Sequence, residues 1–176
     1  MSRIARTGGV ASALLSLAAL VLPAIAEPAL KQPAPPLTIR TGNGGEFDLG
    51  AMRGKVVLVD FWATWCAPCL EELPVIAKFY QKHHAQGFEV IALSVDKPRY
   101  KAKMQRFSAK LPFQAALLSD ASRNGFGTPE AVPVSYVIDA QGIVRDKFIA
   151  IDDELLDRVV LTLLKEAQPR NSGASQ

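Results

Sequence analysis

The stretch Lys55–Cys69, KVVLVDFWATWCAPC, decides the fold and raises the question of function. Residues 55–62 are apolar at both odd and even positions, which predicts a central strand that is covered on both faces of a sheet. Cys66 and Cys69, the only cysteines of the chain, follow this strand, and apolar residues then recur at helical spacing. The stretch therefore predicts an α/β domain in which both sulfurs lie at the start of a helix.

The remaining segments extend this unit in both directions. We expect an N-terminal hairpin at 37–49, a helix at 66–86, strands at 89–95, 114–118, 134–138 and 143–148, and helices at 98–109 and 153–167. Gly87 is placed to end the first helix, and Asp152 to cap the last one. This order predicts a central mixed sheet that is flanked by helices, with the hairpin and a strand-helix insertion added to it.

The two ends of the chain do not fit a folded domain. Arg3 and Arg6, an apolar run at 10–22 and the small residues of Ala24–Ala26 are typical of a secretory signal peptide, with an uncleaved membrane anchor as the alternative. We expect a signal peptide at 1–26, a proline-rich linker at 27–36, a single domain at 37–168 and a disordered tail at 169–176. The predicted location is the periplasm or another extracytoplasmic space, with a membrane anchor as second choice.

The charge of the chain excludes some classes of partner. The 20 Lys and Arg residues, less Arg3 and Arg6, leave 18 basic against 17 acidic residues, so no nucleic acid is expected, and membrane contact only through an uncleaved leader. Locally, Lys97–Lys110 holds six cations and no acid. Such a run is typical of the solvated face of an amphipathic helix, here with Tyr100, Met104 and Phe107 on its apolar side, and docking to an acidic partner or lipid surface is the alternative.

The two cysteines are suited to thiol chemistry. A structural disulfide this close in sequence closes a very small loop and stabilises little. A cysteine at a helix start is surrounded by unpaired N–H groups and the positive end of the helix dipole, which favour its thiolate, so Cys66 is the candidate nucleophile. Cys69, one turn further on, can then attack a mixed disulfide formed at Cys66. No cofactor beyond this redox-active pair is expected.

Metal binding is the rival interpretation. The only histidines, His83 and His84, lie roughly 25 Å along the same helix at ~1.5 Å per residue, too far to complete a site with Cys66 and Cys69. We interpret them as solvated residues near a helix end. A two-thiolate site for Cu(I), as in a metallochaperone-like module, remains the alternative function.

Several other residues near the cysteines have two interpretations each. Asp60, within the apolar strand, is either a hydrogen-bonded acid at a solvated edge or a desolvated proton acceptor for Cys69. Pro133 starts a predicted strand and is expected to follow a trans bond, since only ~5–6% of X–Pro bonds in folded proteins are cis. Glu72 is assigned to a first-turn position that favours the helix dipole. Trp65 is expected on the exposed surface beside the thiol.

The sequence is similar to a known superfamily. VVLVDFWATWCAPC, then Pro74, then AVPVSYVIDAQG resembles thioredoxin-like proteins over about residues 34–166. The signal peptide, the opening APPLTIR, the motif RGKVVLVDFWATWC and the insertion at about 97–118 are similar to the exported TlpA/ResA-like branch.

The resemblance implies roles for particular residues. Cys66 would be the exposed nucleophile, Cys69 the resolving thiol and Asp60 the proton acceptor. Pro133 would follow a cis bond, and Val132 would offer backbone hydrogen bonds to an extended substrate segment. The implied activity is thiol-disulfide exchange with cysteines of exported partner proteins. We expect a reductant, for example in cytochrome c or metalloprotein maturation, that a membrane thiol reductase recharges.

Overall fold

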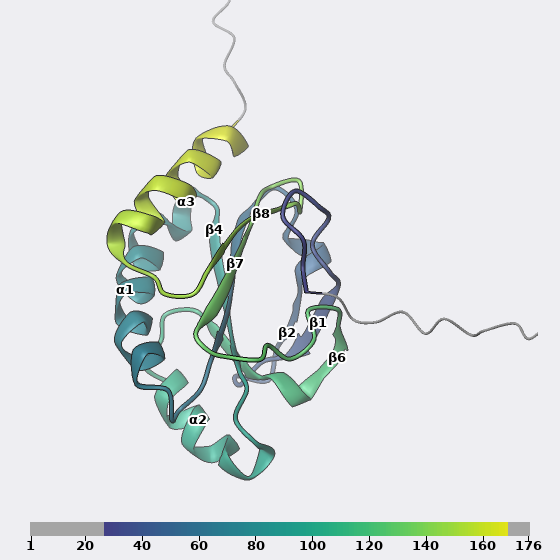
Figure 1. Cartoon of the computed structure of the whole chain (residues 1–176), viewed down its shortest axis with the longest axis vertical. Helices are drawn as coiled ribbons and strands as arrows, with labels where there is room; N and C mark the ends of the chain where they lie inside the picture. Colours follow the sequence, from purple (N-terminus) through teal and green to yellow (C-terminus); the bar gives the residue numbers. More distant parts are fainter. Residues whose placement is uncertain (1–26, 169–176) are drawn as a thin grey trace, which may run out of the picture.

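The computed structural model describes residues 27–168, and the predicted signal peptide and tail lie outside the described residues (Figure 1). The strands are β1 Leu37–Arg40, β2 Glu46–Asp48, β3 Val56–Trp62, β4 Phe88–Ser94, β5 Gln114–Leu117, β6 Ala121–Asn124, β7 Val134–Ile138 and β8 Val144–Phe148. The helices are α1 Ala67–His83, α2 Lys101–Ser108 and α3 Asp153–Ala167. Short 3-10 turns at Leu49–Met52, His84–Gln86, Pro98–Tyr100 and Leu118–Asp120 connect them.

The central sheet has the order β5-β4-β3-β7-β8. β3 pairs in parallel with β4 and antiparallel with β7, and every residue of β3 is buried. The mixed α/β fold and the central position of this strand are as predicted from its apolar run. Because Phe61 pairs with Val134, the segment that follows β3 lies beside the segment that precedes β7. This pairing brings two distant parts of the sequence to one edge of the sheet.

The two faces of the sheet have different covers (Figure 1). On one side α1 and α3 pack in a core that includes Leu58, Ile76 and Val160. On the other side lies a small antiparallel sheet of order β2-β1-β6, whose Ile39 and Phe47 are buried in the second core. The central sheet is thus protected from water on both faces, as the sequence of β3 requires.

The sequence did not predict strand β6. Its residues Ala121–Asn124, ASRN, are polar and only partly buried, so they carry no apolar alternation. The strand forms because β1 offers its second edge, with Leu37 opposite Asn124 and Thr38 opposite Arg123. The predicted N-terminal hairpin of β1 and β2 thereby becomes the middle and edge of a three-stranded sheet.

Two side-chain predictions were wrong. His83 is buried with its ring centroid 4.4 Å from that of Phe79, because it falls on the apolar stripe of α1 rather than after the helix end. In and before α2, the predicted apolar side is only partly buried: Met104 is in the core, whereas Tyr100 and Phe107 are exposed. The α2 segment therefore packs through little more than one side chain.

Residues 27–36, predicted as a linker, lie against the domain and are hydrogen-bonded to it. The Lys31 N–H donates to the Val144 carbonyl, the Val144 N–H donates to Gln32, and Ala34 donates to Gly142. These backbone bonds attach the proline-rich segment to the start of β8. None of the helices within residues 27–168 is both long enough and apolar enough to span a membrane.

Candidate active site

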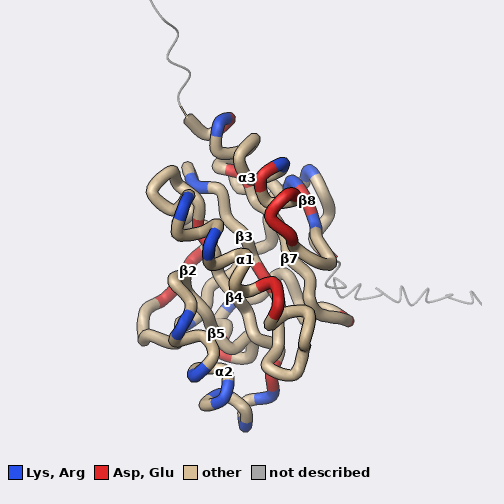
Figure 2. The backbone as a smooth tube through the Cα atoms, turned by 90° about the vertical axis from the view of Figure 1, so that its left-hand side faces the viewer, with Lys and Arg blue, Asp and Glu red and all other residues tan. Residues whose placement is uncertain are grey.

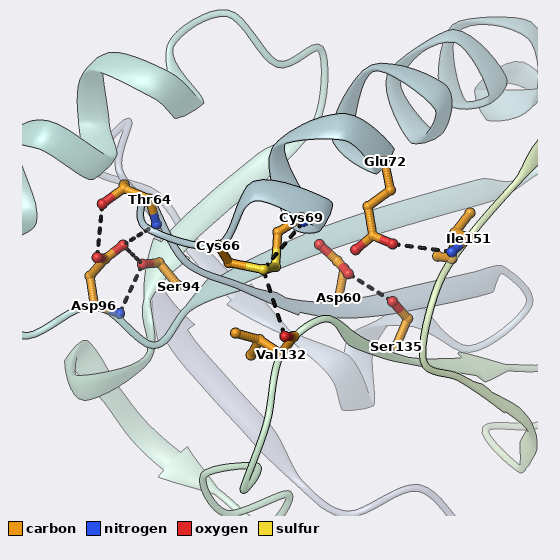
Figure 3. The surroundings of a disulfide bond; sticks show 10 residues. All are labelled: Asp60, Thr64, Cys66, Cys69, Glu72, Ser94, Asp96, Val132, Ser135 and Ile151. Atoms are coloured by element: carbon orange, nitrogen blue, oxygen red, sulfur yellow. Dashed lines mark hydrogen bonds between the residues drawn. A yellow bond between two sulfur atoms is a disulfide. The ribbon is translucent and has the colours of Figure 1, made fainter.

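Cys66 and Cys69 form a disulfide at the start of α1 (Figure 3). Cys66 is the N-cap residue, and its Sγ accepts the N–H of Cys69 at 3.3 Å. Pro68 lies in the first turn, where its missing N–H costs no hydrogen bond. Cys66 is 5% exposed and Cys69 fully buried. An attacking group from solvent therefore meets Cys66 first, and the helix start favours negative charge on its sulfur once the bond is reduced.

The loop before β7 faces this disulfide. The Val132–Pro133 peptide bond is cis, as the family resemblance implied, and the trans expectation was wrong. The Val132 carbonyl oxygen lies 3.6 Å from Cys66 Sγ (Figure 3). The antiparallel pairing of β3 with β7 produces this approach, because it places the residues just outside both strands at the same edge.

A cavity of about 600 Å³ adjoins Pro133 on the side of the small N-terminal sheet. The buried aromatic rings of Phe61 and Tyr136 line it, together with the charged side chains of Glu27 and Lys147, which form an ion pair. The cavity offers apolar surface beside the loop that faces Cys66.

Asp60 is fully buried in β3, so the solvated-edge interpretation was wrong. Its neighbour across the sheet, Ser135, donates a hydroxyl hydrogen bond of 2.7 Å to Oδ1, and Oδ2 has no partner among the described residues. Burial raises the pKa of Asp60 to about 7, against the opposing effect of the Ser135 hydrogen bond. In Figure 3 its carboxyl projects toward the first turns of α1, where Cys69 lies.

Glu72 is a second buried carboxyl, and its predicted place in the first turn of the helix was wrong. Because α1 begins at Ala67, Glu72 is not a first-turn residue, and it points inward, where its Oε2 accepts the Ile151 N–H at 3.1 Å. Burial, followed by the negative charge of Asp60, raises the pKa of Glu72 to about 8. The position of Glu72 in the sequence indicated that it would be buried, since it follows Cys69 by three residues and precedes the buried Ile76 by four.

A third buried acid holds the loop before Cys66. The Asp96 carboxylate accepts the N–H and the hydroxyl of Thr64, each at 2.9 Å, and the hydroxyl of Ser94 at 2.7 Å. These bonds connect the end of β4 to the loop that carries Trp65 and Cys66. Asp96 is buried. Trp65 is 66% exposed, as predicted. Within residues 27–168, no three His, Cys, Asp or Glu side chains gather in a way that could hold a metal ion.

The fold and the site together define a class of protein. A mixed sheet with helices on one face presents a Cys-x-x-Cys disulfide at a helix N-terminus, opposite a cis-proline and above a buried carboxyl. This arrangement is suited to the making and breaking of disulfides, because it provides a stabilised thiolate, a nearby second thiol and a group able to accept a proton.

Comparison with known proteins places the chain in a family within this class. The model of the AhpC/TSA family matches residues 30–147, so the chain belongs to that family, within the thioredoxin superfamily. The thiol-disulfide oxidoreductase ResA of Bacillus cereus is 32% identical over 116 residues, 66% of this chain and 67% of ResA. Tryparedoxin of Trypanosoma brucei brucei is 38% identical over 113 residues, 60% of this chain and 76% of tryparedoxin.

Solved structures agree with this placement. A thiol:disulfide interchange protein DsbE from Chlorobium tepidum superposes with a TM-score of 0.66 at 28% identity, covering 78% of this chain and 99% of that one. The chain is therefore a thioredoxin-like thiol-disulfide oxidoreductase of the TlpA/ResA-like type.

Proposed function

We propose that this chain is exported and reduces disulfides of cysteine-containing partner proteins through Cys66 and Cys69. The observation that supports this most directly is the position of the Cys66 sulfur, at the N-cap of α1 and 3.6 Å from the Val132 carbonyl beside a cis-proline. A reduced Cys66 at this point is both a stabilised thiolate and next to backbone that can align an extended polypeptide.

The reaction has two exchange steps. The Cys66 thiolate attacks one sulfur of the partner disulfide, which forms a mixed disulfide and releases the other partner sulfur as a thiolate. Cys69 then loses its proton and attacks the Cys66 sulfur, which releases the partner as a dithiol and leaves the Cys66–Cys69 disulfide. Two electrons pass to the partner in each cycle, and a membrane thiol reductase returns them to the pair.

Asp60 is the proposed proton acceptor for Cys69 in the second step. A carboxyl with a pKa of about 7 is far closer to the ordinary thiol value of ~8.5 than an exposed aspartate is, which reduces the free-energy cost of the proton transfer. Because Asp60 is buried beneath the helix start, it can act while the mixed disulfide excludes water from the site.

The substrate is an extended segment with a cysteine at its centre. The Val132 backbone would align it by strand addition, and the exposed ring of Trp65 would contact it beside Cys66. The predicted leader supports export, and an oxidising compartment needs dedicated reductants for cysteines that receive haem or metal. Cytochrome c or metalloprotein maturation is the role we favour.

The equilibrium potential of the Cys66/Cys69 pair tests the direction of transfer. We would equilibrate residues 27–168 with dithiothreitol and glutathione buffers, alkylate the free thiols and count the modifications by intact mass. A reductant should have a potential near the ~−270 mV of thioredoxin, whereas a value near ~−120 mV would identify an oxidant and contradict the proposed direction. Cys69→Ser, which cannot form the pair, controls for adventitious modification.

A further inference from the structure

The segment Lys97–Lys110, which contains α2, is an unusually exposed part of the fold. Met104 is the only buried residue of α2, and the other seven are exposed or partly exposed. The aromatic side chains of Tyr100 and Phe107 are 42% and 40% exposed. A helix normally buries an apolar stripe against its own core, so two exposed aromatic residues here indicate a surface that the domain does not cover.

The same segment carries positive charge that the domain leaves mostly unpaired. Among the ion pairs of residues 27–168, only Lys101 of this segment has an acidic partner, Asp120 at 2.7 Å. Arg99 lies over the ring of Tyr100, 4.8 Å from its centroid. Basic residues gather over α2 at the lower end of the molecule in Figure 2. Tyr100 and Phe107 therefore lie among cations, a combination suited to a ligand that is both acidic and partly apolar.

This surface adjoins the active site. The Lys103 ammonium donates to the carbonyl oxygen of Thr64 at 3.4 Å, and Thr64 precedes Cys66 by two residues. Trp65, whose side chain is 66% exposed, lies between Thr64 and Cys66 in the sequence. The Asp96 carboxylate fixes this junction, because it binds both the N–H and the hydroxyl of Thr64. A ligand on α2 therefore lies next to a chain that reacts at Cys66.

We propose that residues 97–110 form a docking surface for an acidic segment of the partner polypeptide, adjacent to its reactive cysteine. This proposal rests on the proposed disulfide exchange and names the substrate class that the site favours. The positive charge of residues 97–110 attracts acidic segments, so it speeds their encounter with the protein and aligns them. A protein occupant is favoured over a lipid surface, because a membrane in contact with α2 and Trp65 would cover the face on which Cys66 must receive its substrate.

The test compares two peptides with the same disulfide. One carries three glutamates beside the cysteine, the other carries glutamines at those positions, and both present the cysteine as a mixed disulfide with 2-mercaptoethanol. Reduced residues 27–168 should react with the acidic peptide about tenfold faster at ~20 mM salt, and the preference should fall toward parity at ~500 mM salt.

Charge reversal tests whether residues 97–110 cause the preference for the acidic peptide. A triple variant with Lys97→Glu, Arg106→Glu and Lys110→Glu should lose or invert the preference. The matched control, Lys82→Glu, Arg158→Glu and Lys165→Glu, changes the net charge equally at exposed positions of α1 and α3 and should retain most of it. Neutral 2-hydroxyethyl disulfide reports the intrinsic reactivity of the thiols in each protein, and circular dichroism reports folding.

The outcomes separate the two proposals. If neither peptide nor 2-hydroxyethyl disulfide is reduced, the proposed exchange activity itself fails. If both peptides react at equal rates in low salt, or if both triple variants reduce the preference equally, the docking surface is refuted while exchange stands. Flotation with vesicles that contain 30% phosphatidylglycerol tests the lipid alternative. The proposal would also be refuted if the wild type bound these vesicles, the variant changed at residues 97, 106 and 110 did not, and the wild type showed no preference for the acidic peptide.

Discussion

Asp60→Asn tests the buried carboxyl beneath the disulfide. The substitution keeps the side-chain volume and an oxygen that can accept the Ser135 hydroxyl, but it removes the ionisable group. The difference between the ordinary pKa of 3.8 and the value of about 7 in the folded protein corresponds to on the order of 4 kcal/mol, since one pKa unit is about 1.36 kcal/mol. Asp60 is fully buried, so solvent screening does not reduce this figure.

The sign of the effect follows from proton binding. Below pH 3.8 both the folded and unfolded chains hold the proton, and burial of Asp60 has no pH-dependent cost. Between pH 3.8 and about 7 the unfolded chain releases the proton and the folded chain keeps it, so the free energy of unfolding of the wild type falls as pH rises. Above about pH 7 the free-energy cost of ionising Asp60 itself is constant, whereas Glu72, whose pKa of about 8 the Asp60 charge helps to raise, still titrates. Asp60→Asn should therefore gain stability relative to the wild type as pH rises from 4 to 8.

Urea unfolding of the oxidised proteins between pH 4 and pH 8.5 measures this difference. The asparagine amide that replaces the unpartnered Oδ2 costs about 1–3 kcal/mol at every pH, so the variant should be less stable at pH 4 and more stable at pH 8. Asp157→Asn, at an exposed position of α3, should change stability by no more than ~0.5 kcal/mol. A difference for Asp60→Asn that does not vary with pH would refute the burial argument.

Two further predictions concern the other buried acids. Glu72→Gln keeps an acceptor for the Ile151 N–H. Because the pKa of Glu72 is about 8, above that of Asp60, Glu72 is still mostly protonated when Asp60 ionises, so the pH midpoint of the second exchange step should stay unchanged. Stopped-flow tryptophan fluorescence across pH measures this step, and a midpoint that moves lower by about one pH unit would show that Glu72 is already charged when Asp60 ionises. Asp96→Ala leaves the Thr64 N–H and hydroxyl without their acceptor and should lower the free energy of unfolding by about 2–4 kcal/mol. If the free energy of unfolding, measured in urea, falls by less than ~1 kcal/mol, the hydrogen bonds from Thr64 to Asp96 contribute little to stability.

The features that the sequence predicted well depend on local pattern. The uniformly apolar β3 had to be a central strand, and a Cys-x-x-Cys pair that precedes helical spacing had to lie at a helix start. α3 begins at Asp153 after the predicted cap Asp152, whose side chain accepts the Leu155 N–H. In each case the residues that determine the structure are neighbours in sequence.

The features that the sequence missed depend on contacts between distant segments. Glu72 is buried because Ile151, 79 residues later, supplies its hydrogen-bond donor. Asp96 has a role only because Thr64, 32 residues earlier, is folded against it. The polar β6 is a strand only because β1 offers an edge. The cis bond before Pro133 likewise ran against the local preference and was expected only from the family resemblance.

Trapping the mixed disulfide shows most directly whether Cys66 is the nucleophile. A Cys69→Ser variant of residues 27–168 should react once with a protein disulfide and stop as a covalent complex, which peptide mapping should locate at Cys66. A Cys66→Ser variant should form no such complex in the same time, because Cys69 is buried and cannot make the first attack. A complex that forms equally well through Cys69, or no complex with either variant, would contradict the assignment of Cys66 as the nucleophile.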